Sequence, residues 1–113
     1  MTPRLKTELR VQAWLRRCAA AGLMATVARR GDAEAGALFL KVNRFTGGCE
    51  VFSGVTRPDG SPAWLRAVGA TPVPEREADA YLARQHGYDP DMWVVEIEDP
   101  RGQFSLDEPI AEI

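Results

Sequence analysis

The sequence predicts an α+β domain, in which an antiparallel sheet of about five strands carries two helices as a two-layer sandwich, in the chain order α-β-β-β-β-α-β. Two observations predict this class. Apolar residues recur at three- and four-residue steps in two separate stretches, which is typical of amphipathic helices. The other apolar or alternating segments are short and bounded by glycine and proline, which is typical of strands joined by turns.

The first helix is predicted over residues 3–21. Thr2 and Pro3 suit a helix start, because proline lacks an N–H group that the first turn would leave unused. Gly22 suits its end, because glycine accepts the left-handed backbone that often follows a helix. We expect the residues that share the helical spacing to face the core: Leu5, Leu9, Val11, Trp14, Leu15, Cys18 and Ala19.

Three strands are predicted next. Residues 23–30 alternate, and Gly31 with Asp32 supplies the turn that ends this strand. Residues 36–44 are apolar on both faces, so we expect a central strand that forms a hairpin with the preceding one. A glycine pair then allows a turn into a strand over 49–54, antiparallel to its predecessor.

A short strand over residues 63–68 precedes the second helix. This helix is predicted over 75–86, because its first turn is acidic, which suits a helix N-terminus, and Gly87 can end it. His86 is the single histidine. Its place at the helix C-terminus favours a capping role over a catalytic one.

The last firm strand is predicted over residues 92–98. Its alternation places Trp93, Val95 and Ile97 on one buried face, and we expect Trp93 to anchor the sheet to a helix. A turn and a further strand at 103–106 follow.

Length and charge bound the possible functions. The 113 residues suffice for a single globular domain over 1–113, with a frayed end after 109. A net charge of −2 excludes a dedicated basic nucleic-acid binder. Residues 1–57 carry ten basic and four acidic side chains, whereas 58–113 carry four basic and twelve acidic ones. We expect the two halves to neutralise each other, with a basic face for a polyanion as the alternative.

The cysteines and the hydropathy indicate a cytoplasmic protein. Cys18 and Cys49 fit no metal-binding or redox spacing, so we interpret them as reduced thiols. No apolar run reaches the roughly 18 residues that a membrane span needs. No cofactor-binding pattern is present, and we expect no cofactor.

One candidate binding surface is basic. We expect Lys6 and Arg10, one helical turn apart, to face water, and a solvated helix face is the competing interpretation of the whole set. The loop 31–36 is flanked by glycines but precedes a strand, so we interpret it as a connection and not as a phosphate-binding loop. The basic set is Lys6, Arg10, Arg16, Arg17, Arg29 and Arg30.

One candidate metal site is acidic. Glu96 and Glu98 should lie on one strand face about 7 Å apart, from a rise of about 3.3 Å per residue. With Asp91 they could hold a divalent cation and activate water for phosphate-ester hydrolysis, with an arginine of the pair Arg29 and Arg30 near the phosphate. The competing interpretation is an exposed strand face preceded by turn-forming aspartates.

Three segments resemble a known family. They are residues 13–18, 29–36 and 89–99, and together they span nearly the whole chain. In order and spacing they resemble the short alphaproteobacterial proteins catalogued as domain of unknown function 1491. The resemblance implies a stand-alone bacterial cytoplasmic protein and brings no catalytic residues. Its segments contain Arg16, Arg17, Arg29, Arg30, Asp32, Glu34, Asp89, Asp91, Trp93 and Glu98.

The function predicted from these observations is binding. No nucleophile with a neighbouring base is evident, so we expect a non-catalytic binding or adaptor domain that contacts a protein or an anionic ligand. The metal-assisted hydrolase is the alternative. A homodimer through an exposed strand edge is compatible with both, whereas nucleic acid and membrane partners are not expected. The predicted binding residues are Arg16, Arg17, Arg29, Arg30 and Asp32.

Overall fold

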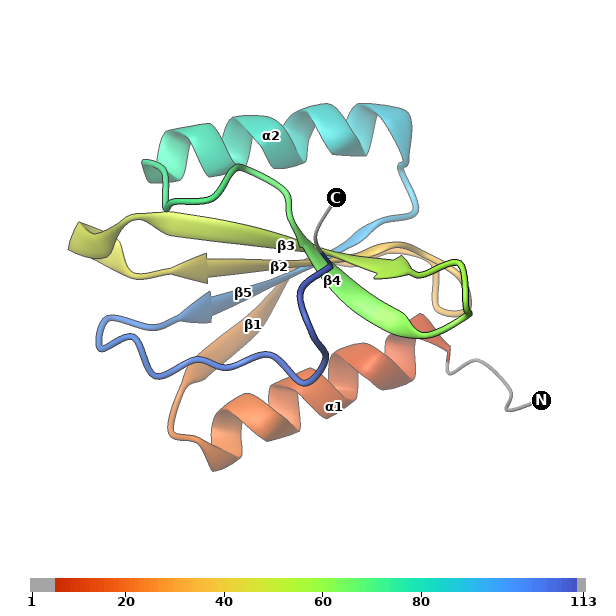
Figure 1. Ribbon diagram of the computed structural model, residues 1–113, viewed down its shortest axis with the longest axis horizontal. Helices are drawn as coiled ribbons and strands as arrows, with labels where there is room; N and C mark the ends of the chain where they lie inside the picture. Colours follow the sequence, from red (N-terminus) through yellow and green to blue (C-terminus); the bar gives the residue numbers. More distant parts are fainter. Residues whose placement is uncertain (1–5, 112–113) are drawn as a thin grey trace.

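A five-stranded sheet lies between the two helices in the computed structural model, which describes residues 6–111 (Figure 1). The elements are α1 (Thr7–Ala20), β1 (Met24–Arg29), β2 (Leu38–Asn43), η1 (Phe45–Gly47), β3 (Cys49–Thr56), β4 (Pro62–Arg66), α2 (Glu75–Tyr88) and β5 (Trp93–Glu98). The predicted α+β class, with two helices and five strands, is confirmed. Within the described chain, no helix is long and apolar enough to cross a membrane.

The helices cover opposite faces of the sheet, so the protein has three layers and the predicted two-layer sandwich is wrong (Figure 1). Strand β2 gives the reason. All of its residues are buried, as predicted for a central strand, and Leu38 and Leu40 pack beneath α1 while Phe39 packs beneath α2. A strand that is apolar on both faces needs a covering layer on each.

Two cores result. The α1-side core is built by Val11, Trp14, Cys18, Leu38, Leu40, Val42, Phe52, Trp64, Trp93, Val95 and Ile97. The α2-side core is built by Phe39, Cys49, Val51, Ala78, Leu82, Met92 and Val94. Trp14 and Trp93 are 3% and 1% exposed, so their predicted core positions are confirmed. The two tryptophans join α1 to the middle of the sheet.

The strand order is β1-β5-β2-β3-β4, which places the last strand between the first two. Strand β5 pairs antiparallel with β1 and parallel with β2. The predicted hairpin between β1 and β2 is therefore wrong, whereas the antiparallel pairing of β2 with β3 is confirmed. The connection from β1 to β2 spans two strand spacings, about 10 Å, which a short loop can cross.

Strand β5 is buried on both faces, whereas burial of one face was predicted. Trp93, Val95 and Ile97 enter the α1-side core, as the alternation predicts. Val94 enters the α2-side core. It lies beneath α2, which the two-layer prediction placed on the same face of the sheet as α1. A position between two strands accounts for the near absence of polar residues in the first half of β5.

The ends of the helices follow the sequence only in part. Gly22 has φ +76° and follows the cap of α1, as predicted. Helix α2 continues to Tyr88, so the predicted end at Gly87 is wrong. Because glycine disfavours but does not forbid helical backbone, the N–H of Asp89 can still donate to the carbonyl of Gln85, at 2.8 Å.

The segment after β5 is not a strand at 103–106, contrary to the prediction. The buried carboxylate of Asp99 instead accepts hydrogen bonds from the N–H groups of Gln103 and Phe104, at 2.7 and 3.0 Å. Fraying was expected after 109, but the N–H of Ala111 donates to the carbonyl of Trp64, at 2.8 Å. The end of the chain at 112–113 lies outside the described residues.

The two cysteines predict a loss of stability in alkaline solution. Cys18 and Cys49 are free and buried on opposite sides of the sheet. Burial raises the pKa of both thiols above their ordinary value of 9.0, so above pH 9 the unfolded chain loses these protons before the folded one does. The free energy of unfolding should therefore fall as pH rises above 9, and urea titrations should give a shallower fall for Cys49→Ala. If the free energy of unfolding fell equally steeply with pH for the native protein and for Cys49→Ala, this prediction would be wrong.

Candidate functional site

Arg17, one of the predicted binding residues, is engaged within the fold. Its guanidinium lies 5.3 Å from the ring centre of Trp14 and donates to the carbonyls of Ser105 and Leu106, at 3.4 and 3.3 Å. These contacts attach the C-terminal segment to α1. One terminal nitrogen of Arg17 is therefore engaged in structural contacts.

The other predicted arginines do not gather into one site. Arg29 donates to Nε2 of His86 on α2, at 3.2 Å, on the opposite side of the sheet from Arg17. Arg30 pairs with Glu8 at 3.0 Å and lies 5.1 Å from the ring centre of Trp93. Arg16 is exposed and makes no hydrogen bond or ion pair within residues 6–111.

Asp32 organises the loop 31–36. Its carboxylate accepts hydrogen bonds from the N–H groups of Glu34 and Ala35, at 3.1 and 2.8 Å, and its own N–H donates to the carbonyl of Asp91, at 2.9 Å. Nε1 of Trp93 donates to the carbonyl of Asp32, at 2.7 Å. Asp32 thus holds the loop against the start of β5.

The same loop caps helix α1. The carbonyls of Ala33 and Glu34 accept the N–H groups of Glu8 and Thr7, at 2.9 and 3.2 Å, which the first turn of a helix leaves without partners. Two of the three segments that carry the family resemblance, 29–36 and 89–99, therefore meet in space beside the start of α1.

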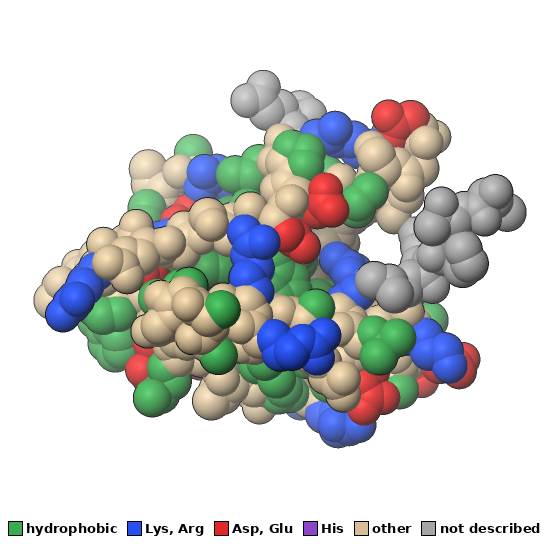
Figure 2. Space-filling model, turned by 90° about the horizontal axis from the view of Figure 1, so that it is seen from below, with side chains coloured by type: hydrophobic (Ala, Val, Ile, Leu, Met, Phe, Trp, Pro, Cys, Tyr) green, Lys and Arg blue, Asp and Glu red, His purple; other side chains and the backbone are tan. Residues whose placement is uncertain are grey.

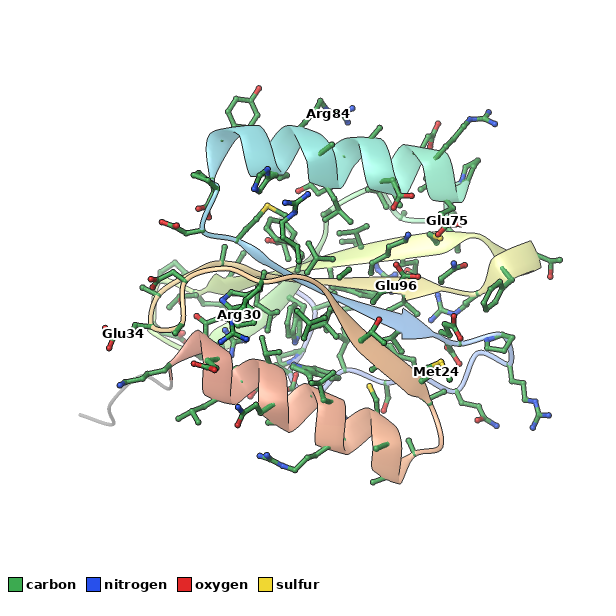
Figure 3. The ribbon with its side chains drawn as sticks, turned by 180° about the vertical axis from the view of Figure 1, so that it is seen from behind. Met24, Arg30, Glu34, Glu75, Arg84 and Glu96 are labelled. Carbon is green, nitrogen blue, oxygen red and sulfur yellow. The ribbon has the colours of Figure 1, made fainter. Side chains whose placement is uncertain are left out.

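Three acidic side chains, two from α2 and one from β5, surround a lysine. Lys41 on β2 is 4% exposed, and its Nζ lies 2.7 Å from carboxylate oxygens of both Glu75 and Asp79 and 3.2 Å from Glu96. Figure 3 shows Glu75 on α2 and Glu96 on β5 converging between helix and sheet. Burial disfavours the charged amine, but these hydrogen bonds outweigh it and hold the pKa of Lys41 above its ordinary value of 10.5.

The residues of the metal alternative are not brought together. Glu96 is bound to Lys41, and Asp91 precedes β5 at its other end. Among residues 6–111, no group of three or more His, Cys, Asp or Glu side chains is placed to hold a metal ion. The ammonium group occupies the position that a cation beside Glu96 would need.

The two halves of opposite charge meet at buried ion pairs, as expected. The three partners of Lys41 come from the acidic half. Arg44, also from the basic half, pairs with Asp99 at 3.3 Å and with Glu50, which also pairs with Arg66. Part of the charge asymmetry is thus neutralised inside the fold.

A groove of about 1070 Å³ lies beside α1. It is bounded by this helix, the connection into β2, the end of β3 with the turn into β4, and the segment at 107–108. Figure 2 views the α1 side of the molecule and shows blue and red side chains interspersed, with no continuous basic patch. The charged lining residues are Arg10, Arg17, Glu34, Asp59, Asp107 and Glu108.

Arg10 enters this groove, so the prediction that it faces water is wrong. Its side chain is half-buried, and its guanidinium lies 5.7 Å from the ring centre of Trp64. Lys6, predicted to face water with it, is exposed as expected. Arg10 differs from Lys6 because Gly54 on β3 and Trp64 on β4 lie beside its guanidinium.

Three residues at or beneath the groove were not found in the sequence: Gly54 and Asp107 line it, and the buried Trp64 lies beneath Arg10. Gly54 and Trp64 face each other across β3 and β4, and Nε1 of Trp64 donates to Asp107 at 2.9 Å. The signal that could have directed attention to them is the spacing of Arg10, Trp14 and Arg17, which places all three along one face of α1. No such spacing marks the sheet residues, because they come from distant parts of the chain.

The edge of β1 is a second accessible surface. Strand β1 pairs only with β5 within the described sheet, and Figure 3 shows Met24 on this outer strand. Met24 and Val27 are 64% and 38% exposed. Such an edge suits addition of another strand, as the expected homodimer would require. It contains no charged anchor before Arg29, so the groove carries the more specific chemistry.

Comparison with known proteins gives a consistent family match. The family model described as "Protein of unknown function (DUF1491)" matches residues 5–107. A crystal structure of a DUF1491 family protein from Caulobacter crescentus is 46% identical, with a TM-score of 0.85 over 96% of this chain and 100% of that chain. No curated protein matches.

Two solution structures are also similar. An NMR structure of a DUF1491 family protein from Caulobacter crescentus is 45% identical, with a TM-score of 0.82 over 98% of this chain and all of the other. A protein from A. tumefaciens is 31% identical, with a TM-score of 0.76 over 96% of this chain and all of the other. The fold is thus shared over nearly the full length of these relatives.

Proposed function

This chain belongs to the DUF1491 family of proteins of unknown function, and we propose that it is a non-catalytic binding domain that holds an extended segment of a partner protein in the groove beside α1. The observation that carries the proposal is the groove itself, whose volume of about 1070 Å³ exceeds that of most sites for small ligands. We propose a cytoplasmic location, which the two free, buried thiols support.

The distribution of reactive groups supports binding over catalysis. A thiol nucleophile needs a nearby base, but Cys18 and Cys49 are buried in separate cores, and burial raises the pKa of each. His86 accepts a hydrogen bond from Arg29 on the side of the sheet away from the groove. The chemistry that the groove offers is instead charge, backbone and apolar surface, which suits recognition.

The construction of the groove supports a protein segment as its occupant. Its walls come from four separate parts of the chain, and glycines at 54 and 60 carry no side chain that would cover the backbone there. Backbone without side chains allows another chain to approach closely. An extended peptide could therefore lie against the end of β3 and place alternate side chains toward α1.

Selection from a library of displayed random peptides tests this proposal. We expect enriched peptides to shift the amide NMR signals of residues 34–38 and 54–60 and to leave those of 96–98 unchanged. The matched control is Ala13→Trp, which places a large side chain at an exposed helix position lining the groove and should abolish binding without loss of stability. Failure to enrich any peptide, or shifts confined to β1 or α2, would refute the proposal.

A further inference from the structure

Arg10 is the one groove arginine whose guanidinium makes no hydrogen bond within residues 6–111. The guanidinium instead lies over the ring of Trp64 in a cation–π arrangement. Arg17, by comparison, donates to two carbonyls. A guanidinium carries five N–H donors, and a half-buried one with none of them satisfied is incompletely solvated and well placed to bind an acceptor.

The floor of the groove beneath Arg10 is open because residue 54 is glycine. A Cβ atom at Gly54 would lie 3.4 Å from the ring of Trp64 and 3.6 Å from a terminal nitrogen of Arg10. Any longer side chain would occupy the space in front of the guanidinium. The stacked ring of Trp64 limits the motion of Arg10, so the donors are held in place before a ligand arrives.

The surroundings of Arg10 select among anions. Asp107 is fixed by Nε1 of Trp64, Asp59 by the Ser61 hydroxyl at 2.6 Å, and Glu34 lies near Lys6. With Glu108, they put four carboxylates on the groove against Arg10 and Arg17. A free inorganic anion would be repelled by this excess of negative charge, whereas an acidic side chain flanked by basic ones would satisfy both signs.

We propose that Arg10 anchors a carboxylate side chain of an extended peptide segment in the groove, and that basic residues flanking this carboxylate pair with the acidic rim. This inference rests on the proposed binding function and names the class of segment that the groove takes. The guanidinium and the carboxylate form a two-point charged hydrogen bond of the kind that fixes both register and orientation.

A double-mutant cycle tests the anchor. The probes are a synthetic peptide with a central glutamate flanked by two lysines on each side and the same peptide with glutamine. We expect the glutamine peptide to bind the native protein about tenfold more weakly, equivalent to about 1.4 kcal/mol. With Arg10→Gln, the two peptides should bind within about twofold of each other, because the coupling is lost.

Two control variants keep the outcome interpretable. Arg16→Gln removes an exposed arginine of the same helix outside the groove and should preserve the tenfold preference. Arg10→Lys keeps the charge, so it should retain part of the preference and the folded NMR spectrum. If the glutamate and glutamine peptides both bind in the groove equally well, the anchor is wrong while the binding function stands.

A parallel titration tests whether Arg10 binds a free small anion instead of a peptide side chain. Acetate and inorganic phosphate are titrated alone as probes. We expect the Arg10 side-chain NMR signals not to shift until the salt concentration is high enough to screen charge interactions throughout the protein. If either small anion binds Arg10 more tightly than the glutamate peptide does, the peptide assignment is overturned. If neither peptide shifts any groove signal, the carboxylate anchor is wrong, whereas the proposed binding function is refuted only if the selection from random peptides also fails.

Discussion

Replacing Gly36 with alanine is expected to destabilise the fold by about 3 kcal/mol or more, among the largest effects of any single substitution in this protein. A Cβ atom at Gly36 would lie under 3.0 Å from the carbonyl oxygen of Asp91, and the same holds at Gly31. Because both contacts are with backbone, no side chain can move aside. The loop would have to leave the start of β5 and release the capping of α1.

Gly87→Ala is the matched control for this prediction. Gly87 lies within α2, where a new Cβ atom would meet nothing within 4 Å, so alanine should stabilise the protein by about 0.5–1 kcal/mol. Urea titrations of both variants measure the difference. A Gly36→Ala protein within 1 kcal/mol of the native one would mean that the loop does not approach Asp91 as described.

Lys41→Met is expected to destabilise the protein by about 2–4 kcal/mol at neutral pH. Methionine fills the space of the lysine stem but leaves Glu75, Asp79 and Glu96 facing one another without a cation. The carboxylates are partly exposed, so water can solvate them again, and this keeps the cost below that of a fully buried pair. The cluster also connects α2 to β2 and β5, so the docking of α2 should weaken.

Alkaline solution separates charge from packing in this variant. Because the ion pairs hold the pKa of Lys41 above its ordinary value of 10.5, the unfolded chain loses this proton before the folded one does, so the difference in stability between native and Lys41→Met should shrink as pH rises above 10.5. Lys6→Met is the control, because the pair of Lys6 with Glu34 is exposed and should contribute less than about 1 kcal/mol. If the difference in stability between the native protein and Lys41→Met stayed constant with pH, the destabilisation would come from packing and not from charge.

The sequence predicted what local patterns determine. The apolar run of β2 identified a strand buried on both faces, and the spacing in α1 identified Trp14 as a core residue. The alternation of Trp93, Val95 and Ile97 gave the correct buried face of β5. These features depend on which side chains are buried, and the spacing of apolar residues in each segment predicts that burial.

The sequence could not predict what distant segments create together. The insertion of β5 between β1 and β2 is a non-local pairing, and the hairpin expected in its place was equally compatible with the turn residues Gly31 and Asp32. The two helices then cover opposite faces because both central strands are buried on both sides. The local pattern of a segment does not specify which strands it pairs with.

The candidate site, too, could be predicted from the sequence only in part. Arg10 was one of the six residues in the predicted basic set, and nothing in its own neighbourhood distinguished it from Lys6. Its environment is made by Gly54 and Trp64, which the β3–β4 hairpin brings to α1. Conversely, Arg17, Arg30 and Asp32 matched a family pattern and are engaged in structural contacts.

The central claim is that the groove beside α1 holds an acidic side chain at Arg10, and intermolecular NOEs test it most directly. In the complex with the glutamate peptide, the side-chain protons of the glutamate should give NOEs to the δ protons of Arg10 and the α protons of Gly54. NOEs from the same glutamate to β1 or α2, with none to Arg10 or Gly54, would contradict the claim.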